Sequence, residues 1–108
     1  MIQDNTIELV NLALDTALMR QTAIAKNIAN INTKNYQTIG VDFEKQLNET
    51  SESLFDTIKP VYEYTDAPNA IDEQIASSIK NATQYRALIK GLNHKFAIMK
   101  LAVQGNNA

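Results

Sequence analysis

Apolar residues recur at alternating steps of three and four along the first third of the chain. The series runs through Ile7, Val10, Leu14, Ala17, Gln21, Ile24, Ile28 and Ile31, and Gln21 is its one polar member. This heptad spacing predicts a helix, within 7–34, with one face packed against another helix. Asn5, with Glu8 three residues later, has the spacing of a capping box at its start. The asparagine-rich run 30–35 marks its end, because asparagine tolerates left-handed backbone.

A second heptad series occupies the last third of the chain. It runs through Ile71, Ile75, Ser78, Ala82, Tyr85, Ile89, Leu92, Phe96, Met99 and Val103, with Ser78 as its polar member. Pro68 suits a first helical turn, and Gly105 is a natural C-terminal stop. We therefore expect a second, longer helix over 68–104.

The segment between the two series, 35–67, has no long hydrophobic period. Residues 37–43 and 61–65 read as extended, and 43–54 as a short amphipathic helix. So long a stretch without firm structure is uncommon inside a compact domain. We expect an irregular connecting segment that becomes ordered against a partner.

These elements predict an all-α, single-domain fold for the 108 residues. The two heptad helices would form an antiparallel, coiled-coil-like pair, joined by a partly extended, loop-rich middle. Residues 1–6 would be a flexible N-terminus and 105–108 a tail. Apolar residues beside the seams, such as Leu18 and Ile79, make the stripes too wide for a two-helix hairpin to cover. The remaining apolar area should be buried against other subunits, and the isolated chain should be loosely folded.

Charge is distributed unevenly along the chain. The net charge of −2 gives no support for binding nucleic acid. Residues 35–70 hold seven acids and two lysines, whereas from Lys80 onward there are five bases and no acid. The basic helix has two interpretations. It is either a solvated face that complements the negative end of the helix dipole, or a surface that docks on the acidic middle of a neighbouring subunit.

Candidate chemistry is sparse. The absence of cysteine excludes disulfides and thiolate metal sites. We expect no cleaved signal peptide, because residues 1–6 are polar, and no inserted membrane segment, because no run of about 18 apolar residues exists. His94 lies off the heptad seam and reads as a helix surface residue. No nucleotide-binding or metal-binding motif is present, so no enzyme, cofactor or metal is predicted.

The most informative cluster is the stretch 20–36. Its alanines keep the helix slim where a neighbour must approach. Asn27 and Asn30 lie three apart on one helix face. Their amides are suited either to bonding across a helix interface or to capping the helix end, and the residues alone do not decide between these.

This stretch resembles the N-terminal signature of the rod and hook family of flagellar axial proteins. The matching residues are Arg20, the Asn-Ile-Ala-Asn core Asn27, Ile28, Ala29 and Asn30, and then Thr33 and Tyr36. The family usually has Pro-Gly between this threonine and tyrosine, where Lys34 and Asn35 stand here.

Two further segments extend the resemblance to about two thirds of the chain. The run Val41, Asp42, Phe43, Glu44, with Leu47 after it, is similar to a feature of the family's proximal rod proteins. The run 81–85, with Leu88, Leu92, Phe96 and Val103 after it, is similar to their closing helix.

The resemblance implies a proximal subunit of the flagellar basal body rod, the hollow drive shaft needed for motility. Such proteins leave the cell through the flagellar type III export apparatus and assemble in the periplasm with other rod and basal body proteins and with copies of themselves. The signature residues would then serve subunit packing. The alternatives are another flagellar rod protein, or a cytoplasmic helical-hairpin adaptor or chaperone, which has no reason to carry the signature.

Overall fold

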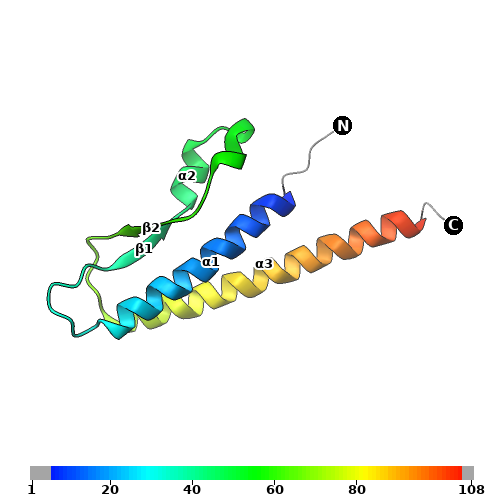
Figure 1. Cartoon of the computed structure of the whole chain (residues 1–108). Coiled ribbons are helices and arrows are strands. Elements are labelled where there is room, and N and C mark those ends of the chain that lie inside the picture. Colours follow the sequence, from blue (N-terminus) through cyan, green and yellow to red (C-terminus); the bar gives the residue numbers. More distant parts are fainter. Residues whose placement is uncertain (1–5, 106–108) are drawn as a thin grey trace.

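Two long antiparallel helices form the body of the molecule (Figure 1). The computed structural model of the chain describes residues 6–105. Its elements are α1 (Thr6–Ala29), β1 (Ile39–Asp42), α2 (Glu44–Glu49), the 3₁₀ helix η1 (Glu52–Thr57), β2 (Val61–Tyr64) and α3 (Ile71–Gly105). The prediction of a mainly helical fold built on an N-terminal and a C-terminal helix is confirmed. The expected flexible N-terminus and tail fall mainly outside the described residues.

α1 ends at Ala29, earlier than the expected 34, because the chain turns at the asparagines. The Asn30 side chain donates from Nδ2 to the carbonyl oxygen of Lys26 (2.8 Å) and so satisfies a carbonyl of the last helical turn. Residues 30–32 and 34–35 form turns. α3 begins at Ile71, three residues after Pro68, and ends at Gly105.

The middle segment folds back on its own chain, which differs from the expectation that it needs a partner to become ordered. β1 and β2 pair in antiparallel register from Ile39 opposite Tyr64 to Asp42 opposite Val61. α2 and η1 connect the strands, and the whole hairpin lies along α1 (Figure 1). The physical reason is a second buried face of α1, which includes Thr16, Ala23 and Asn27 and which a single heptad seam does not reveal.

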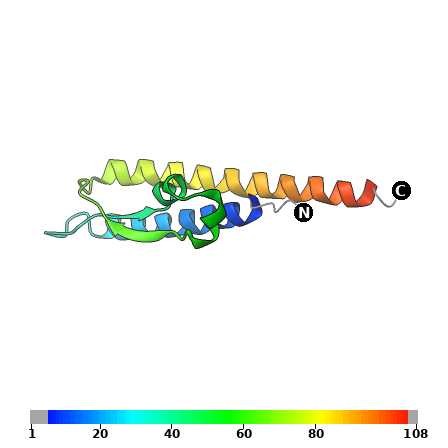
Figure 2. The ribbon, with the colours of Figure 1, turned by 90° about the horizontal axis from the view of Figure 1, so that it is seen from above.

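The molecule is a thin slab. Its extents are 65 × 27 × 14 Å and its radius of gyration is 17.8 Å, against about 13 Å for a compact domain of this length. α3 has 35 residues and α1 has 24, so α3 continues past the start of α1 by about 16 Å at the helical rise of 1.5 Å per residue. Figure 2 shows this free C-terminal end of α3.

The apolar core is small and centres on α1. Among residues 6–105, its buried members are Ala17, Ala23, Ile24, Val41, Phe43 and Ile58. Five polar residues of the same range are buried with them: Thr16, Asn27, Thr38, Gln74 and Asn81. So high a share of buried polar groups requires that they be hydrogen-bonded, and these bonds define the site described below.

The predicted seams are buried to different degrees. Ala17 and Ile24 are buried, Ile7, Val10, Leu14, Ile31, Ala82, Tyr85, Ile89 and Leu92 are half-buried, and Ile75, Phe96, Met99 and Val103 are exposed. The face that α3 turns to α1 instead follows Gln74, Ser78, Asn81, Tyr85, Leu88 and Leu92, which are buried or half-buried. α3 is therefore turned about its axis so that Gln74 and Asn81, and not Ile71 and Ile75, face α1.

Candidate subunit-packing site

Asn27 is the hub of the signature region. Its side chain is 1% exposed. Nδ2 donates to the carbonyl oxygen of Ile39 (2.9 Å) and to Gln74 Oε1 (3.3 Å). Oδ1 accepts from the N–H of Ile39 (3.0 Å) and from the hydroxyl of Tyr36 (2.9 Å). Since both main-chain groups of Ile39 bond to one amide, Asn27 takes the place of a neighbouring strand beside β1.

The backbone of Asn27 extends the same network. Its carbonyl oxygen, near the end of α1, accepts from Asn69 Nδ2 (2.8 Å) in the segment before α3. One residue thus joins α1, the following loop, β1 and the start of α3. Of the two roles that the sequence left open, Asn27 bonds across elements, whereas Asn30 caps the helix end.

The turn after α1 has Lys34 and Asn35 where the resembled family usually has Pro-Gly. Asn35 has a φ of 61°, in the left-handed region. Glycine favours this region and asparagine tolerates it better than other residues. Thr33 Oγ1 donates to Asn30 Oδ1 (3.0 Å), which braces the turn from inside. Asn35 therefore supplies the backbone conformation for which the family usually has glycine.

Arg20 of α1 binds the segment where β1 ends and α2 begins. Its guanidinium donates from Nη1 to Glu44 Oε1 (2.8 Å), forms a second bond from Nη2 to Glu44 Oε2, and donates from Nη2 to the carbonyl oxygen of Val41 (3.2 Å). This two-pronged contact has the geometry that arginine prefers with carboxylates. The hydrogen bond from Arg20 lowers the pKa of Glu44 below its ordinary value, and the same bond raises the pKa of Arg20.

We expect Glu44→Gln to cost about 0.5 kcal/mol or less at neutral pH, because the Glu44 side chain is 60% exposed and solvent screens such pairs. A depressed pKa in the folded state gives stability that is present above the unfolded pKa, about 4.3, and is lost as the pH falls through the folded pKa. Wild type should therefore lose more stability than Glu44→Gln when the pH falls below the unfolded pKa of about 4.3. Urea unfolding at several pH values, with Glu49→Gln as the control, measures this difference. Equal pH slopes for wild type and Glu44→Gln would contradict it.

Amides also hold α3 against α1. Asn81 Nδ2 donates to the carbonyl oxygen of Ala17 (2.7 Å) and to Gln21 Oε1 (3.3 Å). Gln21 Nε2 donates to Ser78 Oγ (3.1 Å). Gln21 and Ser78, the polar members of the two predicted seams, therefore bond to each other. Sequence reasoning missed Gln74 and Asn81, although their separation of seven residues is one full heptad.

An open groove runs along α1 between β1 and α3. Its larger part has a volume of about 590 Å³, with Arg20, Asn27, Glu63, Lys80 and Asn81 among its lining. The adjoining part, of about 390 Å³, is lined more by apolar side chains, including Phe43 and Leu88. Asn81 Oδ1 has no hydrogen-bond partner among residues 6–105.

The other signature residues occupy different environments. Phe43 is 4% exposed, Ile28 and Asp42 are half-buried, and Ala29 is exposed. Arg20, Asn27, Thr33 and Tyr36 make contacts within the chain. A role for these residues in contacts between subunits stays a prediction.

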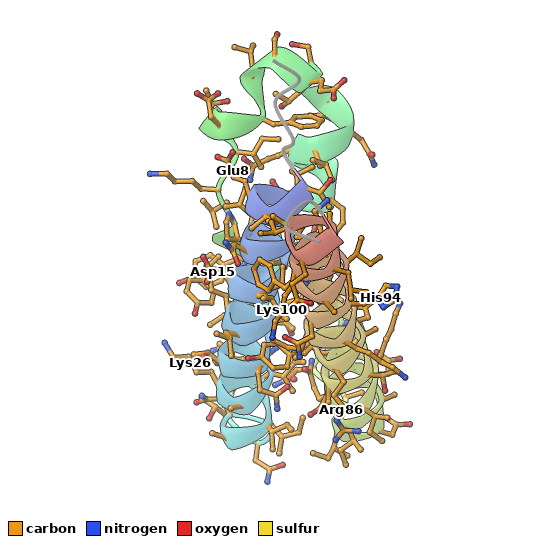
Figure 3. The ribbon with its side chains drawn as sticks, turned by 90° about the vertical axis from the view of Figure 1, so that its right-hand side faces the viewer. Glu8, Asp15, Lys26, Arg86, His94 and Lys100 are labelled. Atoms are coloured by element: carbon orange, nitrogen blue, oxygen red, sulfur yellow. The ribbon has the colours of Figure 1, made fainter. Side chains whose placement is uncertain are left out.

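The described part of the chain offers little for chemistry. Within residues 6–105, no group of three or more histidine or acidic side chains is placed to hold a metal ion. No helix in the same range combines the length and apolar character that crossing a membrane requires. His94 is exposed on the side of α3 away from α1 (Figure 3).

Comparison with known proteins gives one full-length similarity. No family model matches the chain. The chain is 28% identical over 122 residues to the flagellar basal body rod protein FlgB of Bacillus subtilis (strain 168), and the alignment covers 93% of this chain and 94% of that protein. The resemblance found in the signature thus extends over nearly the whole chain, including the middle. Along nearly its whole length the chain is therefore similar to a flagellar basal body rod protein.

Proposed function

We propose that the chain is a structural subunit of the flagellar basal body rod, and within the rod a proximal subunit. The observation that carries this proposal is the similarity to FlgB along 93% of the chain. A role as a structural component also agrees with a site made of packing contacts. The chain is accordingly proposed to be no enzyme.

The shape and surface of the molecule support assembly. Large apolar side chains are exposed on both long helices: Leu18, Ile71, Ile75, Ile79, Phe96, Ile98, Met99, Leu101 and Val103. A slab 14 Å thick has too little interior to bury them, and extended apolar surface of this kind marks interaction sites. Burial against neighbouring subunits would stabilise helices that gain most of their stability from packing. Repeated heterologous contacts between such subunits generate a helical tube.

The finer parts of the proposal concern partners and location. The rod subunit would contact other rod and basal body proteins and copies of itself. It would reach the periplasmic part of the basal body through the flagellar type III export apparatus, without a cleaved signal. A chain without cysteine forms no disulfide that would resist unfolding during export, which supports this route.

The alternatives are another rod protein and a cytoplasmic helical-hairpin adaptor or chaperone. The full-length similarity to a rod protein gives the adaptor no support. Another rod protein would share the helix pair, but the segment 41–44 favours the proximal subunit.

Deleting the gene tests the function. The deletion strain should be non-motile and should lack rods in isolated basal bodies, and the wild-type gene should restore both. Ile28→Asp, which places a charge at a half-buried seam position, should be expressed yet fail to restore rods. Asn11→Ala, at an exposed position of the same helix, should restore them. Normal swimming of the deletion strain would refute the proposal.

A further inference from the structure

The last turns of α3 present a face that the rest of the chain does not cover. Lys90, His94, Ile98 and Leu101, at steps of four, four and three, share one side of the helix. By the helical repeat this side lies opposite the face of Gln74, Asn81 and Leu92 that packs on α1. Ile98 is 53% exposed and Leu101 67% exposed. Figure 3 shows His94 on the side of α3 away from α1. We call Lys90, His94, Ile98 and Leu101 the outer face of α3.

A second surface has the opposite charge. The hairpin tip, residues 49–57, contains the end of α2 and the 3₁₀ helix η1. It carries Glu49, Glu52 and Asp56 and no base, and all three acids are exposed. Leu54, which is 52% exposed, lies between Glu52 and Asp56 in the sequence. Residues 86–105 carry four bases, besides His94, and no acid. Each surface therefore combines exposed apolar side chains with charge of a single sign.

We propose that the hairpin tip of one copy docks on the outer face of α3 of a second copy. Leu54 would pack against Ile98 and Leu101, while Glu52 would face Lys90. The proposal rests on the proposed function, since it describes how rod subunits contact one another. A tip cannot reach the outer face of its own chain, because its hairpin is built on α1 and the outer face is turned away from α1.

The contact joins two different patches and is therefore heterologous. Such contacts do not form a two-fold dimer, and repetition of one builds either a closed ring or an open helical array. Opposite charges favour the correct pairing and speed the encounter. A contact between one hairpin tip and three turns of a helix would bury less than about 1,200 Å² of surface, which is the small end of specific interfaces. A single contact is therefore weak in isolation and is best detected by covalent trapping.

The cysteine-free chain allows a direct test by disulfide cross-linking. Purified Leu54→Cys and Leu101→Cys proteins are mixed under mild oxidation, and each is also oxidised alone. The mixture should give several-fold more cross-linked dimer than either protein alone. Ala76→Cys, at an exposed position at the other end of α3, is the matched control and should not cross-link to Leu54→Cys above background. Equal cross-linking of Leu101→Cys with itself, or none in the mixture, would overturn the proposal.

A charge swap tests the electrostatic part. Lys90→Glu in the Leu101→Cys protein should weaken the contact about two- to fivefold, and so should Glu52→Lys in the Leu54→Cys protein. Combining the two altered proteins should restore the yield, because opposite charges again face each other. If neither charge reversal changes the cross-linking yield, Lys90 and Glu52 do not face each other and the electrostatic part of the proposal is wrong.

The cross-linking result is independent of the motility result. If the gene deletion abolishes rods but the mixture does not cross-link, the rod function stands and this docking mode is wrong. If cross-linking succeeds in a protein whose loss leaves swimming intact, the contact exists but the proposed function fails.

Discussion

Asn27→Leu is expected to separate β1 from α1 and to lower the stability of the chain substantially. The substitution leaves the N–H and carbonyl oxygen of Ile39 and the hydroxyl of Tyr36 without the partners they have now. A buried polar group left unsatisfied costs about 1–3 kcal/mol, so we expect a loss of about 3 kcal/mol or more. Small domains are stable by only about 5–15 kcal/mol in total, and this thin chain has a small core.

A second substitution at Asn27 separates shape from hydrogen bonding. Asn27→Asp keeps the volume of the side chain but replaces the Nδ2 donor by a carboxylate oxygen. That oxygen would face the carbonyl oxygen of Ile39 and Gln74 Oε1, which are both acceptors. The other carboxylate oxygen keeps the N–H of Ile39 and the hydroxyl of Tyr36 as donors. A buried charge with one oxygen against two acceptors is still costly, so Asn27→Asp should also be strongly destabilising.

Circular dichroism at 222 nm during urea unfolding measures both losses. Asn11→Ala is the matched control, because Asn11 is exposed on the same helix and alanine is the better helix former. Its stability should equal or slightly exceed that of wild type. If Asn27→Asp unfolded at the wild-type urea concentration, the hub role of Asn27 would be wrong.

Phe43→Ala is expected to release the hairpin from α1 at a cost of about 3–4 kcal/mol, the usual range for a buried phenylalanine. Phe43 is 4% exposed and lines the groove together with Ala13 and Thr16 of α1. Its carbonyl oxygen also accepts from the N–H of Leu47 in the first turn of α2. Removing the ring leaves a cavity beside Ala13 and Thr16 of α1, while the amide bonds between α1 and α3 do not involve Phe43.

Limited proteolysis and hydrogen exchange distinguish this local release from global unfolding. Residues 44–60 should become cleavable and should exchange rapidly, whereas α1 and the first half of α3 should keep more of their protection. Leu54→Ala is the control in the same hairpin, and since Leu54 is exposed its effect on stability should be within about 0.5 kcal/mol. Uniform loss of protection along the whole chain would mean that the hairpin and the helices unfold as one unit.

Several residues of the site could be identified from the sequence pattern. The pattern singled out Asn27, Tyr36, Arg20 and Phe43 as a group with a shared purpose, and the structure brings them to the junction of α1 with the hairpin. Their observed contacts lie within one chain. A residue that shapes its own subunit also sets the surface presented to neighbours, so the internal contacts are compatible with the predicted role in assembly.

The partners of these residues were harder to foresee. Glu44 lies 24 positions from Arg20, and Gln74 lies 47 positions from Asn27. Nothing in the local pattern identifies either as a partner. Gln74 and Asn81 also break the rule that a seam is apolar, because each bonds to an amide or a carbonyl oxygen that α1 supplies.

The sequence by itself determined the two long helices, the asparagine turn after the first of them and the similarity to rod proteins. These are properties of local spacing, since a repeat of three and four residues defines a helix face wherever the chain lies. The tertiary structure decided which face α3 turns to α1 and where the middle segment rests. Both depend on bonds between distant residues, such as the one that joins Asn81 to Ala17 across 64 positions, and periodicity along the chain carries no information about such pairs.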